Sequence, residues 1–180
     1  QLLKYEFEKI FPGCRLLDIH EYLMEKGVKL DGADLNQIGG EKYLYHDPCH
    51  TPMKTHAPLK VANALLGGAP DSGAVKLSDR CCGESGTLAV SRPDISTQIR
   101  FRKEEEIRAG VAALGGEGKG PVKLLTSCPS CLQGLARYRD DAGTEPDYIV
   151  VELAKQLLGE QWMTHYLARV GNGGIERVLL

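Results

Sequence analysis

The sequence predicts an α/β fold in which helices cover both faces of a parallel sheet, giving a three-layer domain. Short apolar runs alternate with helical patterns along the chain. This alternation is typical of parallel strands joined by crossover helices. The 180 residues suffice for one well-formed core. A hydrophobic content of 42% and a charged content of 26% are those of an ordinary globular domain.

Four runs are candidates for the strands. Lys42–Tyr45 leads into His46-Asp47-Pro48-Cys49-His50, and Pro48 should end the strand because proline cannot donate a hydrogen bond to a sheet. Val122–Thr126 is the clearest candidate, a run of the buried type. The other two candidates are Ala74–Ser78 and Tyr148–Val151.

Helix signals fill the segments around these strands. Ser91 is expected to cap a long helix, with Pro93 in the first turn and Asp94 three residues after the cap. The charged run Arg100–Arg108 is interpreted as the solvated face of this helix. Its apolar stripe comprises Ile95, Ile99, Ile107, Val111 and Leu114. Further helices are expected over Gln1–Phe11, Pro58–Leu66, Glu84–Val90 and Pro129–Arg139. Two more are expected after the strand candidate Tyr148–Val151, one that ends at about Leu158 and one near Gln161–Val170.

Charge and hydropathy exclude several classes of function. A net charge of −2 and a pI near 6.2 give no electrostatic reason to expect a nucleic-acid partner. No apolar run approaches the roughly 20 residues of a membrane-spanning helix. No basic segment followed by an apolar one resembles a secretion signal, so a cytoplasmic protein is expected. No Gly-x-Gly-x-x-Gly follows a strand, so no dinucleotide or flavin site is expected in this chain.

We interpret the chain as one domain over residues 1–180, with its core at about 42–158. It begins at Gln1, inside a helical pattern and without an initiator Met, which indicates a fragment of a longer protein.

Five of the six cysteines follow predicted strands and precede predicted helices: Cys49, Cys81, Cys82, Cys128 and Cys131. In a parallel sheet such positions lie at one edge, outside the carboxyl ends of the strands, where ligands usually bind. The sequence therefore predicts that these cysteines converge on one site. Cys14 stands apart and is interpreted as structural or incidental.

The cysteine spacing indicates metal or redox chemistry rather than a disulfide framework. Cys128-x-x-Cys131 at a helix start can present two sulfurs to one metal, and nearby amides favour thiolate. The adjacent Cys81 and Cys82 cannot easily bind one ion together, but they can bind neighbouring irons of a polynuclear cluster. Gly83 would let the backbone approach the sulfurs closely.

Three strings carry a resemblance to a known family: Tyr45-His46-Asp47-Pro48-Cys49-His50, Cys81-Cys82-Gly83-Glu84-Ser85-Gly86 and Ser127-Cys128-Pro129-Ser130-Cys131. Over roughly Lys42–Tyr138 the chain resembles the cysteine-rich CCG domain. This domain occurs in one of the subunits of heterodisulfide reductase, in the iron–sulfur subunit of glycolate oxidase and at the C-terminus of large FAD-linked oxidoreductases. The segment Gly173–Leu180 looks like a natural C-terminus, which favours the last of these as the parent.

The resemblance implies a noncubane [4Fe–4S] cluster held by Cys49, Cys81, Cys82, Cys128 and Cys131. It also implies an electron-transfer module of an oxidoreductase that oxidises a 2-hydroxy acid, such as lactate or glycolate, at an upstream FAD. Flavin and ferredoxin-like domains of the same protein would be the partners, and a quinone, disulfide or other compound the acceptor. A quinone acceptor would place the protein at the membrane surface.

Two departures from the family pattern stand out. The gap from Cys82 to Cys128 is longer than usual, which the loop Gly115–Gly120 can absorb. Many relatives carry two CCG repeats, whereas this chain has one.

Two other functions stay open. A structural zinc module would need four ligands, which Cys49, one of the vicinal pair, Cys128 and Cys131 can supply. A thiol–disulfide catalyst would use Cys81–Cys82 or Cys128–Cys131. His50 and Gly83 are candidates for hydrogen bonding to cluster sulfurs, and His50 is also a candidate zinc ligand. His46 also flanks Cys49, and a loop histidine bound to backbone is an equal alternative for both histidines.

Overall fold

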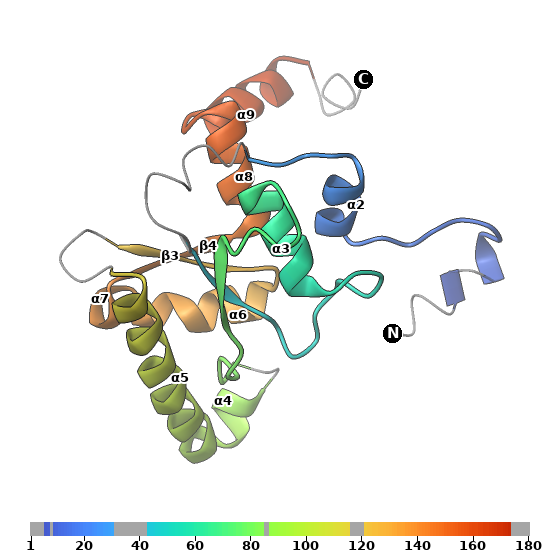
Figure 1. The fold of residues 1–180 in the computed structure, drawn as a ribbon. Helices are drawn as coiled ribbons and strands as arrows, with labels where there is room; N and C mark the ends of the chain where they lie inside the picture. The colour runs from blue at the N-terminus through green and yellow to red at the C-terminus, as the bar shows by residue number, and fades with distance from the viewer. Residues whose placement is uncertain (1–5, 8, 31–42, 85–86, 116–120, 174–180) are drawn as a thin grey trace.

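The structure is a computed structural model that describes residues 6–7, 9–30, 43–84, 87–115 and 121–173 (Figure 1). The predicted helix Gln1–Phe11 is only partly covered by these ranges, with residues 6–7 and 9–10 helical. Lys42, Ser85, Gly86, the loop at 116–120 and the segment 174–180 lie outside the described residues. Within the described ranges, no helix has the length and apolarity needed to cross a bilayer.

A four-stranded parallel sheet with the order β2-β1-β3-β4 forms the middle of the molecule. β1 pairs with both β2 and β3, so that His46 lies opposite Ser78 on one side and Thr126 on the other. The predicted α/β fold with a parallel sheet is therefore confirmed. The strands are β1 (Tyr43–His46), β2 (Val75–Ser78), β3 (Val122–Thr126) and β4 (Thr144–Tyr148).

Helices cover both faces of the sheet, as Figure 1 shows. Successive strand residues point to opposite faces. Tyr43 and Tyr45 therefore pack on one face with residues of α3 and α8, and Leu44 packs on the other with residues of α5 and α6. The helices are α2 (Ile19–Glu25), α3 (Pro58–Gly67), α4 (Leu88–Ser91), α5 (Pro93–Ala113), α6 (Pro129–Leu135), α7 (Arg139–Ala142), α8 (Ile149–Leu158) and α9 (Trp162–Gly173), with a 3₁₀ turn η2 (Ala136–Tyr138).

Helix α3 illustrates how local sequence sets the ends of an element. Pro58 occupies the first turn, where its missing N–H costs nothing, and Gly68 ends the helix with a left-handed backbone at φ +78°. Between them, a continuous run from Val61 to Leu66 is buried against the sheet. The helix returns the chain from the edge that carries Cys49 to the start of β2.

The predicted strand Tyr148–Val151 is wrong. The fourth strand is the preceding Thr144–Tyr148, and Ile149 begins α8. β4 pairs only with β3, and an edge strand tolerates its polar composition and Pro146. The apolar run instead supplies a helix face, because Ile149 and Leu153 lie four residues apart and are both buried.

The predicted cap of the long helix is also wrong. Ser91 is the last residue of α4, and its hydroxyl donates to the Thr87 carbonyl at 3.0 Å. Arg92 occupies the cap position of α5, and its guanidinium binds Asp94. Only the position of Pro93 in the first turn is as predicted. α4 begins at Leu88, so Glu84 lies outside the helix predicted over Glu84–Val90.

The face of α5 also differs from the prediction. Ile107 and Val111 are buried as expected, whereas Ile95 is exposed. Lys103, within the run assigned to solvent, has an exposed fraction of 0%. The prediction that the charged residues of this run face solvent is wrong at Lys103, because α5 packs against the strands and this position faces inward together with Ile107.

Candidate metal centre

Three loops at one edge of the sheet carry the five cysteines of the predicted site. The loops follow β1, β2 and β3, which are neighbours in the sheet. Cys49 lies in the first loop, Cys81 and Cys82 lie in the second, and Cys128 lies in the third just before α6. Cys131 lies in the first turn of α6. Parallel strands end at the same edge, so residues far apart in sequence meet there.

Cys82 and Cys131 form the buried part of this group. Their sulfurs lie 3.4 Å apart in a hydrogen bond, and their residues are 3% and 6% exposed. The hydrogen bond with Cys131 lowers the pKa of Cys82 to about 4. The same bond, together with burial, raises the pKa of Cys131. The contact therefore favours the thiolate form of one sulfur of the pair and disfavours it at the other.

Cys49, Cys81 and Cys128 form the outer part. Cys49 is exposed, and the other two are half-buried. Burial raises the pKa of the Cys49 thiol, and so does the neighbouring Cys81 sulfur. The Cys128 side chain neighbours Cys131 and contributes to the raised pKa of the Cys131 thiol. Cys14 is exposed, and no contact of the described residues joins it to the group.

Backbone N–H groups point at two of the sulfurs. The Gly83 N–H donates to Cys81 Sγ at 3.4 Å, and the Cys131 N–H donates to Cys128 Sγ at 3.5 Å. Such bonds stabilise negative charge on sulfur. Gly83 has φ +78°, and a Cβ there would lie 2.9 Å from the Arg100 Cγ on α5. A glycine is therefore needed for the loop to approach α5 this closely.

His46 is the residue that the sequence prediction undervalued. It ends β1, is 0% exposed, and one of its ring nitrogens lies within 4.8 Å of the Cys82 and Cys131 sulfurs. Its Nδ1 lies 3.1 Å from the Ser78 carbonyl oxygen. His50, one of the two candidates for hydrogen bonding to cluster sulfurs, is exposed. The position in the chain is the signal that could have identified His46. His46 ends a strand and is held by the sheet, whereas His50 lies beyond Pro48, after the strand has ended.

A buried ionic network lies behind His46. The Lys103 ammonium donates to the Ser78 carbonyl at 3.0 Å, to the Ser78 hydroxyl at 2.6 Å and to Glu106 Oε2 at 2.7 Å. Burial lowers the pKa of Lys103, although Glu106 opposes this. Burial would raise the pKa of Glu106, but hydrogen bonds from Lys103 and Ser78 prevail and lower it. The Ser78 carbonyl therefore joins this network to the His46 ring.

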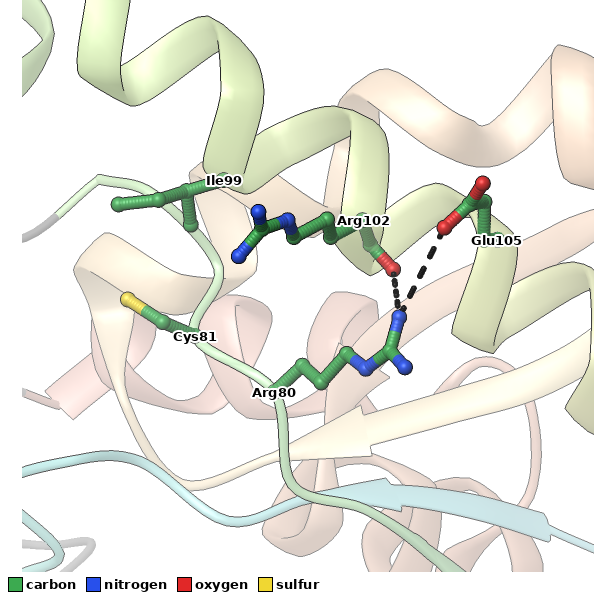
Figure 2. Close-up of a pocket in the computed structure, with 5 residues that line it drawn as sticks. All are labelled: Arg80, Cys81, Ile99, Arg102 and Glu105. Atoms are coloured by element: carbon green, nitrogen blue, oxygen red, sulfur yellow. Dashed lines mark hydrogen bonds and ion pairs between the residues drawn. The ribbon is translucent and has the colours of Figure 1, made fainter.

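The outer side of the site opens on a pocket of about 500 Å³ beside Cys81. Figure 2 shows the Arg102 guanidinium extending toward Ile99 and Cys81, whereas Arg80 extends toward Glu105. Arg80 Nη1 donates to the Arg102 carbonyl at 2.9 Å and lies 3.8 Å from Glu105 Oε2. Solvent and small solutes can thus approach the Cys81 side, while the Cys82 side is closed.

The donor set fits a metal centre of the thiolate type. Five cysteines lie in three loops at one edge of the sheet, and among them Cys82 and Cys131 offer sulfurs within 4.8 Å of each other and of a ring nitrogen of the buried His46. Thiolate and imidazole are the donors that iron–sulfur clusters and zinc use in proteins.

Comparison with known proteins places this geometry in a family. The model of the CCG cysteine-rich domain matches residues 43–136, just over half of the chain and all five cysteines of the site. The chain belongs to the CCG family. Residues 136–180 match a second model, described as the domain of unknown function DUF3400.

Several methanogen proteins are similar to this CCG chain. One of the subunits of the fumarate reductase (CoM/CoB) of Methanothermobacter marburgensis is 26% identical over 133 residues, covering 72% of the chain and 24% of that protein. An uncharacterized iron–sulfur protein of Methanococcus maripaludis is 26% identical over 149 residues, covering 79% of the chain and 27% of that protein. One of Methanocaldococcus jannaschii is 25% identical over 161 residues, covering 82% and 31%.

The chain thus spans about a quarter to a third of the length of these relatives. No solved structure matches it.

Proposed function

We propose that this chain is an iron–sulfur electron-transfer module of an oxidoreductase. In this proposal Cys49, Cys81, Cys82, Cys128 and Cys131 hold a [4Fe–4S] cluster of the noncubane type. The observation that supports it best is the placement of the five thiols after three adjacent strands, with the Cys82 and Cys131 sulfurs 3.4 Å apart. The related iron–sulfur proteins and the related reductase support it independently.

When bound, the cluster supplies one-electron transfer, and the residues of the chain set its surroundings. The N–H groups of Gly83 and Cys131 reduce the negative charge on Cys81 and Cys128. Hydrogen bonds to sulfur and exclusion of water are two of the factors that set the potential of such clusters. The buried side at Cys82 excludes water, whereas the pocket beside Cys81 leaves a short path for electrons to an acceptor.

The wider enzyme is also part of the proposal. An FAD elsewhere in the protein would oxidise a 2-hydroxy acid such as lactate or glycolate. Electrons would reach this module through ferredoxin-type clusters and leave to a quinone, a disulfide or another acceptor. The protein would work in the cytoplasm, and with a quinone it would work at the membrane surface. The resemblance of the CCG motif to FAD-linked oxidoreductases is the basis for this context.

One observation favours a zinc module as the second candidate. His46, Cys82 and Cys131 offer three ligand atoms within 4.8 Å of one another, a separation that suits one ion. Such a module would bind one zinc per chain and would show no reduction wave.

Anaerobic reconstitution with iron and sulfide distinguishes the two candidates. The cluster proposal predicts about four irons per chain, an equal amount of acid-labile sulfide and broad visible absorption that bleaches on reduction. Cys14→Ser serves as the control and should take up the same iron, whereas Cys82→Ser should take up much less. A chain that binds no iron under these conditions, or only one zinc in competition with iron, would overturn the electron-transfer proposal.

A further inference from the structure

His46 is held in one orientation by the end of the sheet. It is the last residue of β1 and pairs with Ser78 of β2 and Thr126 of β3. No part of the residue is exposed. Its ring therefore cannot turn out to solvent, and its two nitrogens must find partners inside the protein.

The Ser78 carbonyl fixes the tautomer of this ring. A carbonyl oxygen only accepts hydrogen bonds, so the Nδ1 that lies 3.1 Å from it must carry the proton. In the neutral ring Nε2 then holds a lone pair.

Nε2 is fully buried, no nitrogen or oxygen atom of the described residues forms a hydrogen bond with it, and the Cys82 sulfur is the group with which the His46 side chain interacts. A buried polar atom without a partner costs about 1–3 kcal/mol. The sulfurs of Cys82 and Cys131 lie within 4.8 Å of a ring nitrogen of His46. Histidines that bind metals almost always donate their other ring N–H to a carboxylate or a backbone carbonyl, as His46 does here.

We propose that His46 Nε2 is a nitrogen ligand of the metal centre, next to Cys82 and Cys131. This inference rests on the proposed function for which metal group is bound. The geometry that supports it is the same whether that group is a cluster or a single ion. Ser78 and Lys103 act as positioning residues, because they hold the carbonyl that orients the ring. The centre would thus have a mixed sulfur and nitrogen donor set.

The test is pulsed electron paramagnetic resonance on the full chain with ¹⁵N-labelled histidine. One sample is reconstituted with iron and sulfide and reduced to a paramagnetic state, and a second holds Co²⁺ alone. We expect a strong histidine nitrogen coupling in both samples of the unsubstituted chain. This measurement needs no variant, so it does not depend on whether a substituted chain folds.

Two variants assign the coupling. His46→Ala should lose it entirely, whereas His50→Ala, which removes an exposed histidine close to Cys49, should keep it. Iron uptake without a histidine coupling, or a coupling that survives His46→Ala, would refute the inference while leaving the proposed function intact. If no iron binds, the proposed function fails, and the Co²⁺ sample alone decides whether His46 is a ligand.

Discussion

Replacing Lys103 with methionine tests whether the network behind His46 stabilises the fold. Methionine keeps most of the buried volume and removes the charge. In this variant the Ser78 carbonyl still accepts a hydrogen bond from His46, and the Ser78 hydroxyl still donates one to Glu106. The main loss is therefore the positive charge of Lys103 that balances the Glu106 carboxylate. Removing one partner of a buried ion pair costs about 3–5 kcal/mol.

We expect the low end of this range, because the Glu106 side chain is 19% exposed and stays partly hydrated. A loss of about 3 kcal/mol should lower the melting temperature by about 6–12 °C for a chain of this size. The assay is urea unfolding followed by circular dichroism, with reductant and chelator present so that no metal contributes. The m-value should not change.

Two further variants sharpen this prediction. Lys103→Met with Glu106→Gln leaves no charge in this network, so the double variant should lose only about 1 kcal/mol. Arg108→Met breaks the exposed pair with Glu104 on the same helix and should cost no more than about 0.5 kcal/mol. The reasoning is refuted if Lys103→Met costs no more than Arg108→Met, or if the costs of the two single substitutions simply add in the double variant.

Three other predictions concern the site and its pH dependence. In the metal-free reduced chain, iodoacetamide should label Cys14 and Cys49 first, because both are exposed; after reconstitution, mass spectrometry should find only Cys14 labelled, and continued labelling of Cys49 would remove it from the ligand set. The pKa of Glu106 is lowered in the folded state, so its contribution to stability is full above its ordinary value of 4.5 and is lost as the pH falls through the lowered value. Urea titrations between pH 3 and 6 should show this loss in the unsubstituted chain and a smaller one in Glu106→Gln, and equal slopes would contradict the assignment. Gly83→Ala forces a side chain into a left-handed backbone, at a cost of about 1–2 kcal/mol; iron content should fall with it, while Gly27→Ala, which meets no neighbouring atom at φ +75°, should lose similar stability but keep its iron.

The strand ends could be predicted from the sequence because their signals are local. Val122–Thr126 is an apolar run closed by a Cys-Pro turn, and the structure has β3 over the same residues. The convergence of the cysteine loops then follows from the geometry of parallel strands. The edge strand could not be found in this way, because β4 contains two acidic residues and a proline, and its partner β3 rather than its own pattern makes it a strand.

Lys103 and His46 show why the surroundings of the site were harder to predict. The burial of Lys103 depends on Ser78 and Glu106, which lie 25 residues and one helical turn away, respectively. A charge run alone does not show which of its members faces the sheet. For His46, the deciding facts are the Ser78 carbonyl and the distance to two sulfurs, and both depend on the pairing of β1 with β2.

The order of strands in the sheet has a consequence for how the protein matures. The five thiols come together only when β1 has paired with both β2 and β3, two crossover connections that span much of the chain. A partly folded chain that lacks either pairing presents two or three sulfurs and no complete set. Under the proposed function, the complete ligand set would therefore exist only after the sheet has assembled, and iron would enter from the side of the exposed Cys49 and the half-buried Cys81, because Cys82 and Cys131 are buried.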